Sequence, residues 1–192
     1  MMSNKLILGS LSPRRQELLK QVNIPFTVRN PNVDESKITS NDPIEKVEQL
    51  ASLKAKNISL SENEVILSAD TVVAYQNNIV EKPQSKEDAY HMISKLSGNS
   101  HDVYTGVMLR SLHESKMIVE RTEVAFLPLT EEEVHWYIST EEPYDKAGAY
   151  GIQSLGASLV RKINGDFYNV VGLPLSRVVR ELRYFSIFPN ND

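Results

Sequence analysis

The sequence predicts an α/β protein with a long, curved mixed β-sheet, helices on both of its faces and a cleft between two lobes. Segments rich in β-branched residues alternate with amphipathic segments along the chain. Some consecutive strands are joined by tight hairpins, and others are separated by helices that act as crossovers, so the sheet must contain antiparallel and parallel pairs. Because 192 residues are enough for one large core, we expect a single domain over residues 1–192.

Composition excludes several classes of function. With a net charge of −4, the chain lacks the basic surface that nucleic acid requires, so any anion binding is expected at a local pocket. The absence of cysteine excludes disulfides, thiolate metal sites and cysteine nucleophiles. No apolar run approaches the roughly 20 residues of a membrane span, and the N-terminal run is too short for a signal peptide. We therefore expect no membrane partner and a cytoplasmic location.

The first half of the chain predicts two strands around a helix, a polar loop, a second helix and a long strand. Asp42 as N-cap and Pro43 at the first position indicate where the second helix begins. Lys54 then falls on or beside the apolar stripe of that helix. The predicted ranges are strand 6–8, helix 14–22, strand 26–29, loop 30–42, a helix from 43 and strand 64–75.

The second half predicts hairpins and three further helices. A tight turn follows the long strand and sends the chain back beside it. Thr130 and Glu133 have the spacing of a capping box at the start of a helix. The predicted ranges are turn 76–78, strand 79–80, helix 85–96, paired strands 103–112 and 116–127, helix 130–139, glycine-rich loop 148–156, strand 159–163 and helix 175–185.

The turn after the first strand has the features of an anion site. Ser10 and Ser12 lie in this turn, Pro13 is near the first helical position, and Arg14 and Arg15 follow at once. Unpaired N–H groups at a helix start, the helix dipole and an arginine fork all favour phosphate. The motif is not a P-loop, because the Gly spacing and the Gly-Lys-Ser/Thr ending are absent. The alternative is an ordinary strand–turn–helix with a serine cap and exposed arginines.

Asp70 and Thr71 interrupt an apolar strand. A carboxylate in such a place is costly to bury unless it is paired or binds a metal, so Asp70 is a candidate general base or metal ligand. The alternative, a cap at a strand end, is disfavoured because the strand continues beyond Thr71. If residues 76–78 form a hairpin turn, Lys82 returns level with Asp70 or close to it. Taken alone, Glu81 and Lys82 also read as an exposed charge pair.

Three further residues become candidates beside Asp70. Glu35, in the polar loop, could be a second metal ligand, because Mg²⁺ takes one or two carboxylates together with substrate phosphate oxygens. Lys54 could contribute charge to the same site or simply extend along the helix to solvent. Gln153 ends a loop of small residues that lets backbone approach a ligand, and its amide could read a base edge. The alternative for that loop is a plain connection.

Six motifs, taken together, resemble the Maf family of nucleoside triphosphate pyrophosphatases. Each motif alone is weakly specific, but their occurrence in family order over nearly the whole chain is highly specific. The matching segments are residues 10–19 (SLSPRRQELL), 69–73 (ADTVV), 81–83 (EKP), 96–98 (LSG) with 105–107 (TGV), 142–143 (EP) with 145–153 (DKAGAYGIQ), and 172–174 (GLP).

The resemblance implies a fold shared with the inosine triphosphate pyrophosphatases, a homodimer, and cleavage of a nucleoside triphosphate to the monophosphate and pyrophosphate. It implies a divalent metal, Mg²⁺ or Mn²⁺, held by Asp70 and Glu35. Asp70 matches the catalytic acid–base position, and whether it acts as base, ligand or both stays open. The resemblance places Ser10, Arg14, Glu35, Lys54 and Lys82 in the surrounding polar site, with Arg14, Thr71 and Gln153 at positions associated with substrate choice. The anion-site motif adds Ser12 and Arg15 as candidates for substrate binding.

That combination of selecting residues resembles the branch acting on dTTP and UTP, with modified pyrimidine analogues as further substrates and house-cleaning as the cellular purpose. Two other interpretations remain open from the sequence. One is a nucleotide-binding regulator of cell division and septum formation with little turnover, although a pure binder has no need of a buried acid. The other is a pyrophosphatase for CTP or for a non-canonical purine nucleotide.

Overall fold

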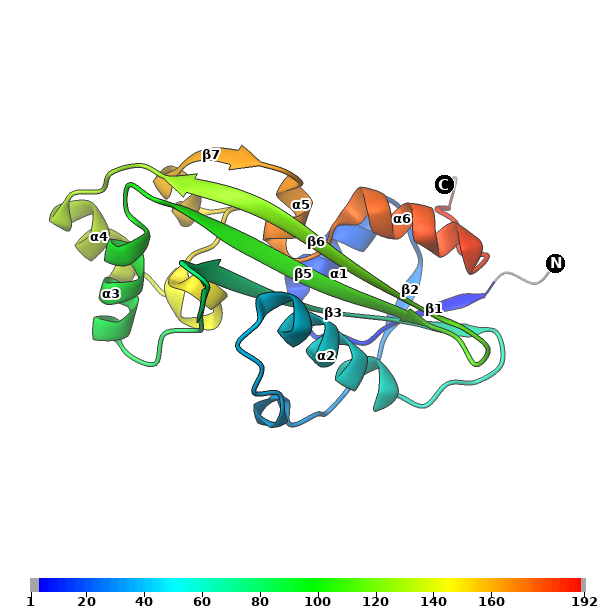
Figure 1. Cartoon of the computed structure of the whole chain (residues 1–192). Coiled ribbons are helices and arrows are strands. Elements are labelled where there is room, and N and C mark those ends of the chain that lie inside the picture. The colour runs from blue at the N-terminus through cyan, green and yellow to red at the C-terminus, as the bar shows by residue number, and fades with distance from the viewer. Residues whose placement is uncertain (1–3, 191–192) are drawn as a thin grey trace.

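A seven-stranded mixed sheet forms the centre of the computed structural model, which describes residues 4–190 (Figure 1). The strands follow the order β2-β1-β3-β5-β6-β7, and β4 pairs with β3 beside this path. β1 is parallel to β2 and β3, and the remaining pairs are antiparallel. The strands are β1 (Lys5–Leu8), β2 (Phe26–Val28), β3 (Glu64–Tyr75), β4 (Asn78–Val80), β5 (Ser100–Arg110), β6 (Ser115–Phe126) and β7 (Val160–Asn164).

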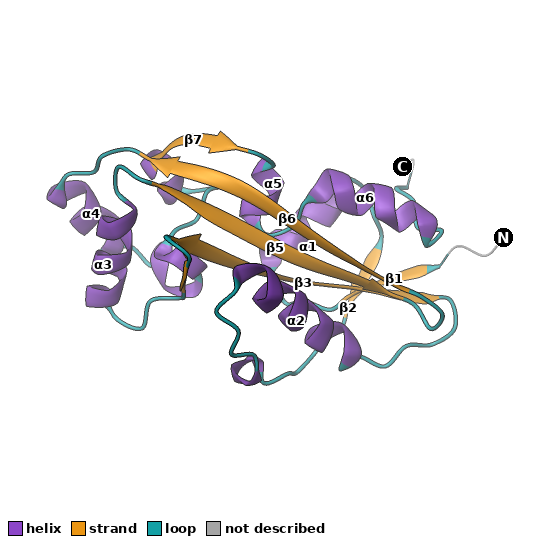
Figure 2. Cartoon of the chain, viewed as in Figure 1, coloured by secondary structure: helices purple, strands orange, loops and turns teal. Residues whose placement is uncertain are grey.

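Helices lie on both sides of the sheet, as the colours of Figure 2 show. In the view of Figure 1, α2 lies in front of β3, while α1 and α5 lie behind the sheet. None of the helices within residues 4–190 combines the length and the apolar character needed to cross a membrane. The helices are α1 (Pro13–Gln21), α2 (Pro43–Lys56), α3 (Lys86–Leu96), α4 (Glu131–Ile138), α5 (Phe167–Val171) and α6 (Leu175–Tyr184), with short 3₁₀ segments η1 (Glu35–Lys37), η2 (Glu142–Asp145), η3 (Ala147–Ala149) and η4 (Leu155–Leu159).

The elements occur in the predicted order, so the predicted fold class is confirmed. Helix starts follow the predicted capping chemistry: the Asp42 carboxylate accepts from the N–H groups of Ile44 and Glu45, and Thr130 and Glu133 form a complete capping box. Several details differ from the prediction. The loop 30–42 contains η1, the glycine-rich loop 148–156 overlaps η3 and η4, and α5 was not among the predicted helices. β5 begins at Ser100 because its ladder with β6 extends further than residue propensity indicates.

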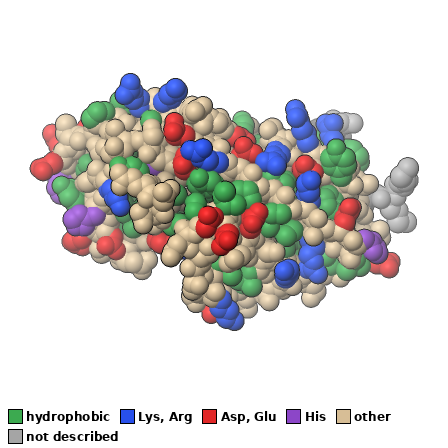
Figure 3. Space-filling view, in the orientation of Figure 1, with side chains coloured by type: hydrophobic (Ala, Val, Ile, Leu, Met, Phe, Trp, Pro, Cys, Tyr) green, Lys and Arg blue, Asp and Glu red, His purple; other side chains and the backbone are tan. Residues whose placement is uncertain are grey.

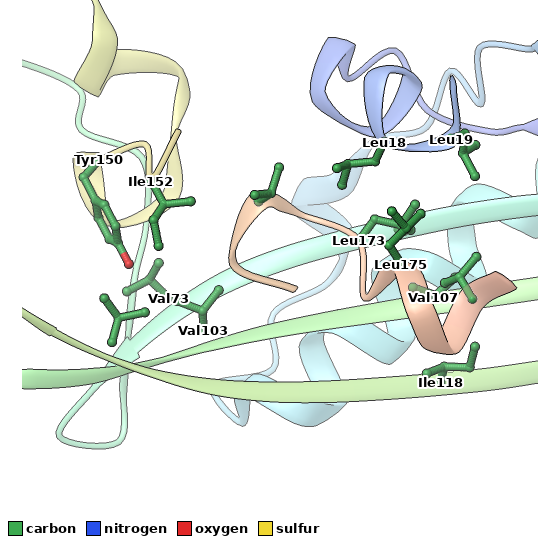
Figure 4. Close-up of a cluster of buried hydrophobic side chains, with 14 of the residues drawn as sticks. Leu18, Leu19, Val73, Val103, Val107, Ile118, Tyr150, Ile152, Leu173 and Leu175 are labelled. Carbon is green, nitrogen blue, oxygen red and sulfur yellow. The ribbon is translucent and has the colours of Figure 1, made fainter. Parts of the chain in front are cut away.

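Apolar side chains pack the helices and loops onto the sheet (Figure 4). Near α1 and α6, the cluster includes Leu18, Leu173 and Val107, all fully or almost fully buried. Towards the other end, Tyr150 and Ile152 lie against the sheet near Val73 and Val103. The loop that carries Gln153 is therefore anchored by buried side chains on either side of Gly151.

Two different strands, β1 and β4, pair with the same edge of β3 and leave a gap between them. β1 pairs with β3 as far as Leu8 opposite Leu67, and β4 pairs with it only from Val80 opposite Val73. In the described part of the chain, residues 68–72 of β3 therefore have no strand on this edge, although β5 pairs with them on the other. Ligand sites in α/β sheets form where neighbouring strands diverge in this way. Asp70 and Thr71 lie in the middle of the gap.

Candidate active site

A cavity of about 1130 Å³ opens at this gap. Its volume is slightly above the range of roughly 300–1,000 Å³ that is typical of sites that bind small molecules. All ten residues predicted for the site line it, and their individual roles remain predictions. They are Ser10, Ser12, Arg14, Arg15, Glu35, Lys54, Asp70, Thr71, Lys82 and Gln153.

The cavity carries more positive than negative side chains, although the whole chain has a net charge of −4. On the face shown in Figure 3, basic and acidic side chains are interspersed and form no single basic field. The cavity therefore has a positive excess that the whole chain lacks, and this excess favours a polyanionic ligand in the cavity. The cationic side chains are Arg14, Arg15, Lys46, Lys54, Lys82 and Lys146, and the acidic ones are Glu35, Asp70, Glu81 and Asp145.

Asp70 and Glu35 converge on one ammonium group. Lys54 Nζ lies 2.6 Å from Asp70 Oδ1 and 2.9 Å from Glu35 Oε1. The side chains of Lys54 and Asp70 are only 10% and 14% exposed, whereas that of Glu35 is 54% exposed. A pair this shielded from water interacts more strongly than a surface ion pair. Lys54 therefore fixes the orientation of Asp70 at the mouth of the gap.

The closeness of α2 to the sheet brings Lys54 to Asp70. Gly106 on β5 is the register partner of Asp70, and a Cβ there would lie 2.6 Å from the carbonyl oxygen of Val47 on α2. Only glycine allows this approach. Ser68, on the same face of β3 as Asp70, donates to the carbonyl of Ala51 at 2.6 Å and ties the helix to the strand.

Two expectations about the lysines are corrected. Lys54 does not extend to solvent but is buried against the two carboxylates, because α2 packs directly over β3. Lys82 does not form the expected pair with Asp70, since β4 ends at Val80 and Lys82 lies two residues beyond the ladder. Lys82 still lines the same cavity as an exposed side chain.

The carboxylates of Asp70 and Glu35 fit a divalent cation of the hard, oxygen-binding kind. Both carboxylates face the same point of the cavity, where they now share one ammonium group. Within residues 4–190, no group of three or more histidine, aspartate or glutamate side chains could hold a metal by itself. Two carboxylates completed by phosphate oxygens and water are a typical donor set for Mg²⁺.

The start of α1 forms another wall of the cavity. Ser12 is the N-cap residue, but its side chain makes no capping hydrogen bond, and its own N–H donates to Ser10 Oγ at 3.3 Å. The serine cap considered above is thus not formed, and N–H groups of the first turn stay available. Arg14 reaches across to Asp145, with 3.4 Å between Nη1 and Oδ2, as a partly exposed pair.

Arg15 is only 9% exposed and turns into the molecule. Its Nε donates to the carbonyl of Gly172 at 2.8 Å, its Nη1 to Ser10 Oγ at 3.2 Å, and its Nη2 to Thr71 Oγ1 at 3.1 Å. Burial lowers the pKa of the Arg15 guanidinium, and the nearby Asp70 opposes that shift. An arginine stays protonated in proteins, so this side chain places a fixed positive charge beside the gap.

Glu142 organises the loop that carries Gln153. Its carboxylate accepts hydrogen bonds from the side chains of Tyr137 and Ser154 and from the N–H groups of Leu155 and Gly156. Burial acts to raise the pKa of Glu142, but these hydrogen bonds outweigh it and hold the pKa below its usual value. The loop is thereby fixed, with Gln153 exposed on the cavity wall.

His101 supports the same loop from beneath. It is 3% exposed, and its Nε2 lies 2.8 Å from the hydroxyl of Tyr150. Burial lowers the pKa of His101 from 6.5 to about 4. As the pH falls, His101 therefore becomes protonated near pH 6.5 in the unfolded chain but only near pH 4 in the folded protein.

We expect the free energy of unfolding to fall as the pH drops from 6.5 to 4, by about 3 kcal/mol from this residue. Urea unfolding of the wild type and of His101→Gln, which keeps a partner for Tyr150 and does not titrate, measures this contribution. The difference in stability between the two proteins should be constant above pH 6.5 and should shrink below it. A difference that stays constant to pH 4.5 would contradict the prediction.

Sequence reasoning missed two residues that organise the site. Glu142 belongs to a motif of the family resemblance, but no local pattern shows that its carboxylate takes four donors. Thr105 is fully buried and bonds to Thr71 across the β3–β5 ladder. The register that pairs these threonines could have been derived from the hairpin only if both strand ends had been known.

Comparison with known proteins agrees with the geometry. The family described as Maf-like protein matches residues 5–185. The dTTP/UTP pyrophosphatase of Halalkalibacterium halodurans is 51% identical over 179 residues, which are 93% of this chain and 94% of the relative. The dTTP/UTP pyrophosphatase of Symbiobacterium thermophilum is 49% identical over 182 residues, 94% of each chain.

A solved structure shows the same architecture at low sequence identity. The HAM1 protein from Coxiella burnetii superposes with a TM-score of 0.53 and 13% identity, covering 94% of this chain and 99% of its own. This likeness supports the α/β fold alone. The family match and the two relatives extend over almost the whole chain, and on that evidence the chain belongs to the Maf family.

Proposed function

We propose that this protein hydrolyses dTTP and UTP to the nucleoside monophosphate and pyrophosphate, with water attacking the α-phosphorus. The observation that carries the proposal is the Asp70–Lys54–Glu35 cluster, which lies at the gap in the sheet inside a cavity with a local excess of positive charge. The names of the relatives, dTTP/UTP pyrophosphatases, support the substrate class.

The cationic wall of the cavity suits the triphosphate. Arg14, Arg15, Lys54 and Lys82 come from three different elements and face one space. Free N–H groups at the start of α1 and the positive end of its dipole add to this wall. Preorganised charges of this kind stabilise the charge that develops on the phosphates and on the leaving pyrophosphate.

Asp70 is the proposed general base. Its Oδ1 is held by Lys54, and among the described residues no hydrogen bond engages its Oδ2. The free oxygen can accept the proton of a water molecule that is aligned with the scissile bond. Lys54 prevents the carboxylate from rotating away and offsets its charge before the phosphates enter.

Asp70 and Glu35 are the proposed ligands of Mg²⁺ or Mn²⁺. When bound, the ion supplies a Lewis acid that polarises phosphoryl oxygens and acidifies water. Lys54 now neutralises both carboxylates, and it is positioned to pair with a phosphate oxygen when substrate and ion are present. These residues supply only part of a coordination sphere, so the ion is expected to depend on the nucleotide for further oxygens.

Gln153 is the proposed reader of the pyrimidine. Its amide offers both a donor and an acceptor, as the uracil and thymine edges require. We expect Gln153→Ala to lower the preference for UTP and dTTP over CTP by about tenfold or more, with a smaller effect on hydrolysis in general. Relative kcat/KM values across the nucleotides measure this effect. Gln49→Ala on the exposed face of α2 is the control, and unchanged relative rates in Gln153→Ala would show that the residue does not contact the base.

The proposed function is tested by pyrophosphate release from canonical and modified nucleoside triphosphates, with Mg²⁺, with Mn²⁺ and with chelator. Metal-dependent cleavage confined to UTP, dTTP and modified pyrimidine analogues is the expected result. Nucleotide binding without cleavage of any substrate would instead support a regulator of cell division. Rapid cleavage of a purine nucleotide alone would overturn the substrate assignment.

The proposal includes a homodimer, which the family resemblance implies, and a cytoplasmic location, which the sequence analysis predicts. Light scattering on the purified protein measures the assembly directly. A monomer at all concentrations would contradict that part of the proposal and would leave the proposed chemistry unaffected, since the cavity is lined by residues of one chain.

A further inference from the structure

The buried charge of Arg15 lacks an anionic partner. Among the described residues its three hydrogen bonds all end on neutral oxygens, those of Gly172, Ser10 and Thr71. A guanidinium has five N–H donors, so one donor remains on each of Nη1 and Nη2. Two such donors form the fork that binds two oxygens of one phosphate. The hydrogen bond from Nη2 to Thr71 Oγ1 helps to fix the orientation of this fork.

Nη2 is held by a chain of hydroxyl groups with a defined direction. Thr105 Oγ1 donates to the main-chain carbonyl of Asn169 at 3.0 Å, so its only proton is used. The 2.9 Å contact between the hydroxyls of Thr71 and Thr105 must then be a donation from Thr71. Thr71 is left to accept from Arg15 at 3.1 Å. We call Arg15, Thr71, Thr105 and the Asn169 carbonyl the threonine chain.

This direction limits what Thr71 can do for a ligand. Thr71 lines the cavity, but its proton is used within the threonine chain, so it has no donor to offer a base or a sugar. Toward a ligand Thr71 can therefore act only as an acceptor, and its established role in the threonine chain is to present an oriented acceptor to Arg15. The end of the chain, at Thr105 and Asn169, is fully buried.

We propose that Thr105, which does not line the cavity, is a positioning residue for nucleotide binding: through Thr71 it orients the Arg15 fork toward the phosphates. The proposal rests on the proposed function for its ligand, a nucleoside triphosphate. Without the Thr105 hydroxyl, the half-buried Thr71 hydroxyl loses the acceptor that fixes the direction of its proton. The Thr71 side chain then rotates towards another acceptor and withdraws its oxygen from Nη2.

The test compares Thr105→Val, which removes only the hydroxyl, with Thr105→Ser, which retains it. The first measurement is the exchange rate of the Arg15 side-chain N–H protons in the free protein, followed by NMR and assigned by the loss of signal in Arg15→Lys. The second is the affinity for a UTP analogue whose α–β bridging oxygen is replaced by NH. We expect Thr105→Val to speed exchange and to weaken binding about tenfold, and Thr105→Ser to restore both.

Thr122→Val is the matched control. Thr122 is also fully buried and bonds to the same helix, accepting from Asn169 Nδ2 at 3.0 Å and donating to the carbonyl of Asp166 at 3.0 Å. Among the described residues Thr122 makes no hydrogen bond with Arg15, Thr71 or Thr105, so Thr122→Val should lower stability without changing the Arg15 signals or the affinity. If Thr105→Val does not fold, Thr71→Val interrupts the same chain one step closer to Arg15.

The outcomes separate this proposal from the proposed function. Unchanged Arg15 signals in Thr105→Val would overturn the role of Thr105 in orienting Arg15. Changed signals with unchanged affinity, or an equal loss of affinity in Thr122→Val, would overturn its role in nucleotide binding. A wild type that neither binds nor cleaves any nucleoside triphosphate would overturn the proposed function and the binding role assigned to Thr105 with it. The NMR measurement would still decide whether Thr105 orients Arg15.

Discussion

Asp70→Asn is expected to lower kcat for UTP hydrolysis by about 10²–10⁴-fold while leaving the fold intact. The amide keeps the size of the carboxylate but cannot take a proton from water. The fold should survive because Lys54 keeps a second carboxylate partner, Glu35, at 2.9 Å. Thermal unfolding should therefore change little, and nucleotide binding should remain measurable.

The measurement is single-turnover hydrolysis in saturating Mg²⁺, because it reports the chemical step without product release. Asp102→Asn is the control: Asp102 lies on β5, pairs with Arg121 at 2.9 Å and is outside the cavity. It should hydrolyse UTP like the wild type. Near-normal single-turnover rates in Asp70→Asn would show that another group accepts the proton.

Hydrophobic periodicity and capping residues predicted most strands and helices of this chain, because local preferences and tertiary packing favour the same elements. Segments of β-branched residues became strands, and Asp42 and Thr130 cap the helices that their spacing predicts. The misplaced start of β5 shows the limit. Residues 100–102 are polar, and they are extended because β6 offers them a ladder, which no local pattern reveals.

The site residues were identified by type and motif, but their partners were not. A carboxylate inside an apolar strand demands a counter-charge, and Asp70 has one in Lys54. Choosing Lys82 as its neighbour assumed that β4 continues past Val80, whereas the strand ends there and α2 supplies Lys54 instead. Helix-on-sheet packing of this kind depends on Gly106 and Ser68, whose importance appears only when the register is known.

Composition and motif predicted where positive charge gathers, but not the surroundings of each charged side chain. The net charge of −4 predicts that any anion binding is local, and the motif at the start of α1 places cations at the cavity, as predicted. The sequence could not show that Arg14 and Arg15, adjacent in the chain, have different surroundings. Arg14 pairs with Asp145 at the rim, whereas Arg15 is buried among neutral acceptors.

Lys54→Met is expected to lower kcat/KM for UTP by on the order of 100-fold or more and to lower the free energy of unfolding by about 1–3 kcal/mol. Activity falls because a charge next to the phosphates is lost and Asp70 is no longer oriented. Stability falls because Asp70, only 14% exposed, loses its cation and faces Glu35 without one. Lys56→Met, an exposed lysine of the same helix, should change neither quantity.

The double variant Lys54→Met/Asp70→Asn separates the effect on stability from the effect on activity, because it should regain stability but not activity. Removing the Asp70 charge leaves only Glu35, which is 54% exposed and can be hydrated, so the lost stability should largely return. Activity should stay at the level of Asp70→Asn or below it. Urea unfolding and single-turnover hydrolysis on all four proteins give the complete cycle. If the double variant recovers no stability, the Lys54–Asp70 pair is not what holds α2 at the site, and the orientation of Asp70 must come from packing at Gly106 alone.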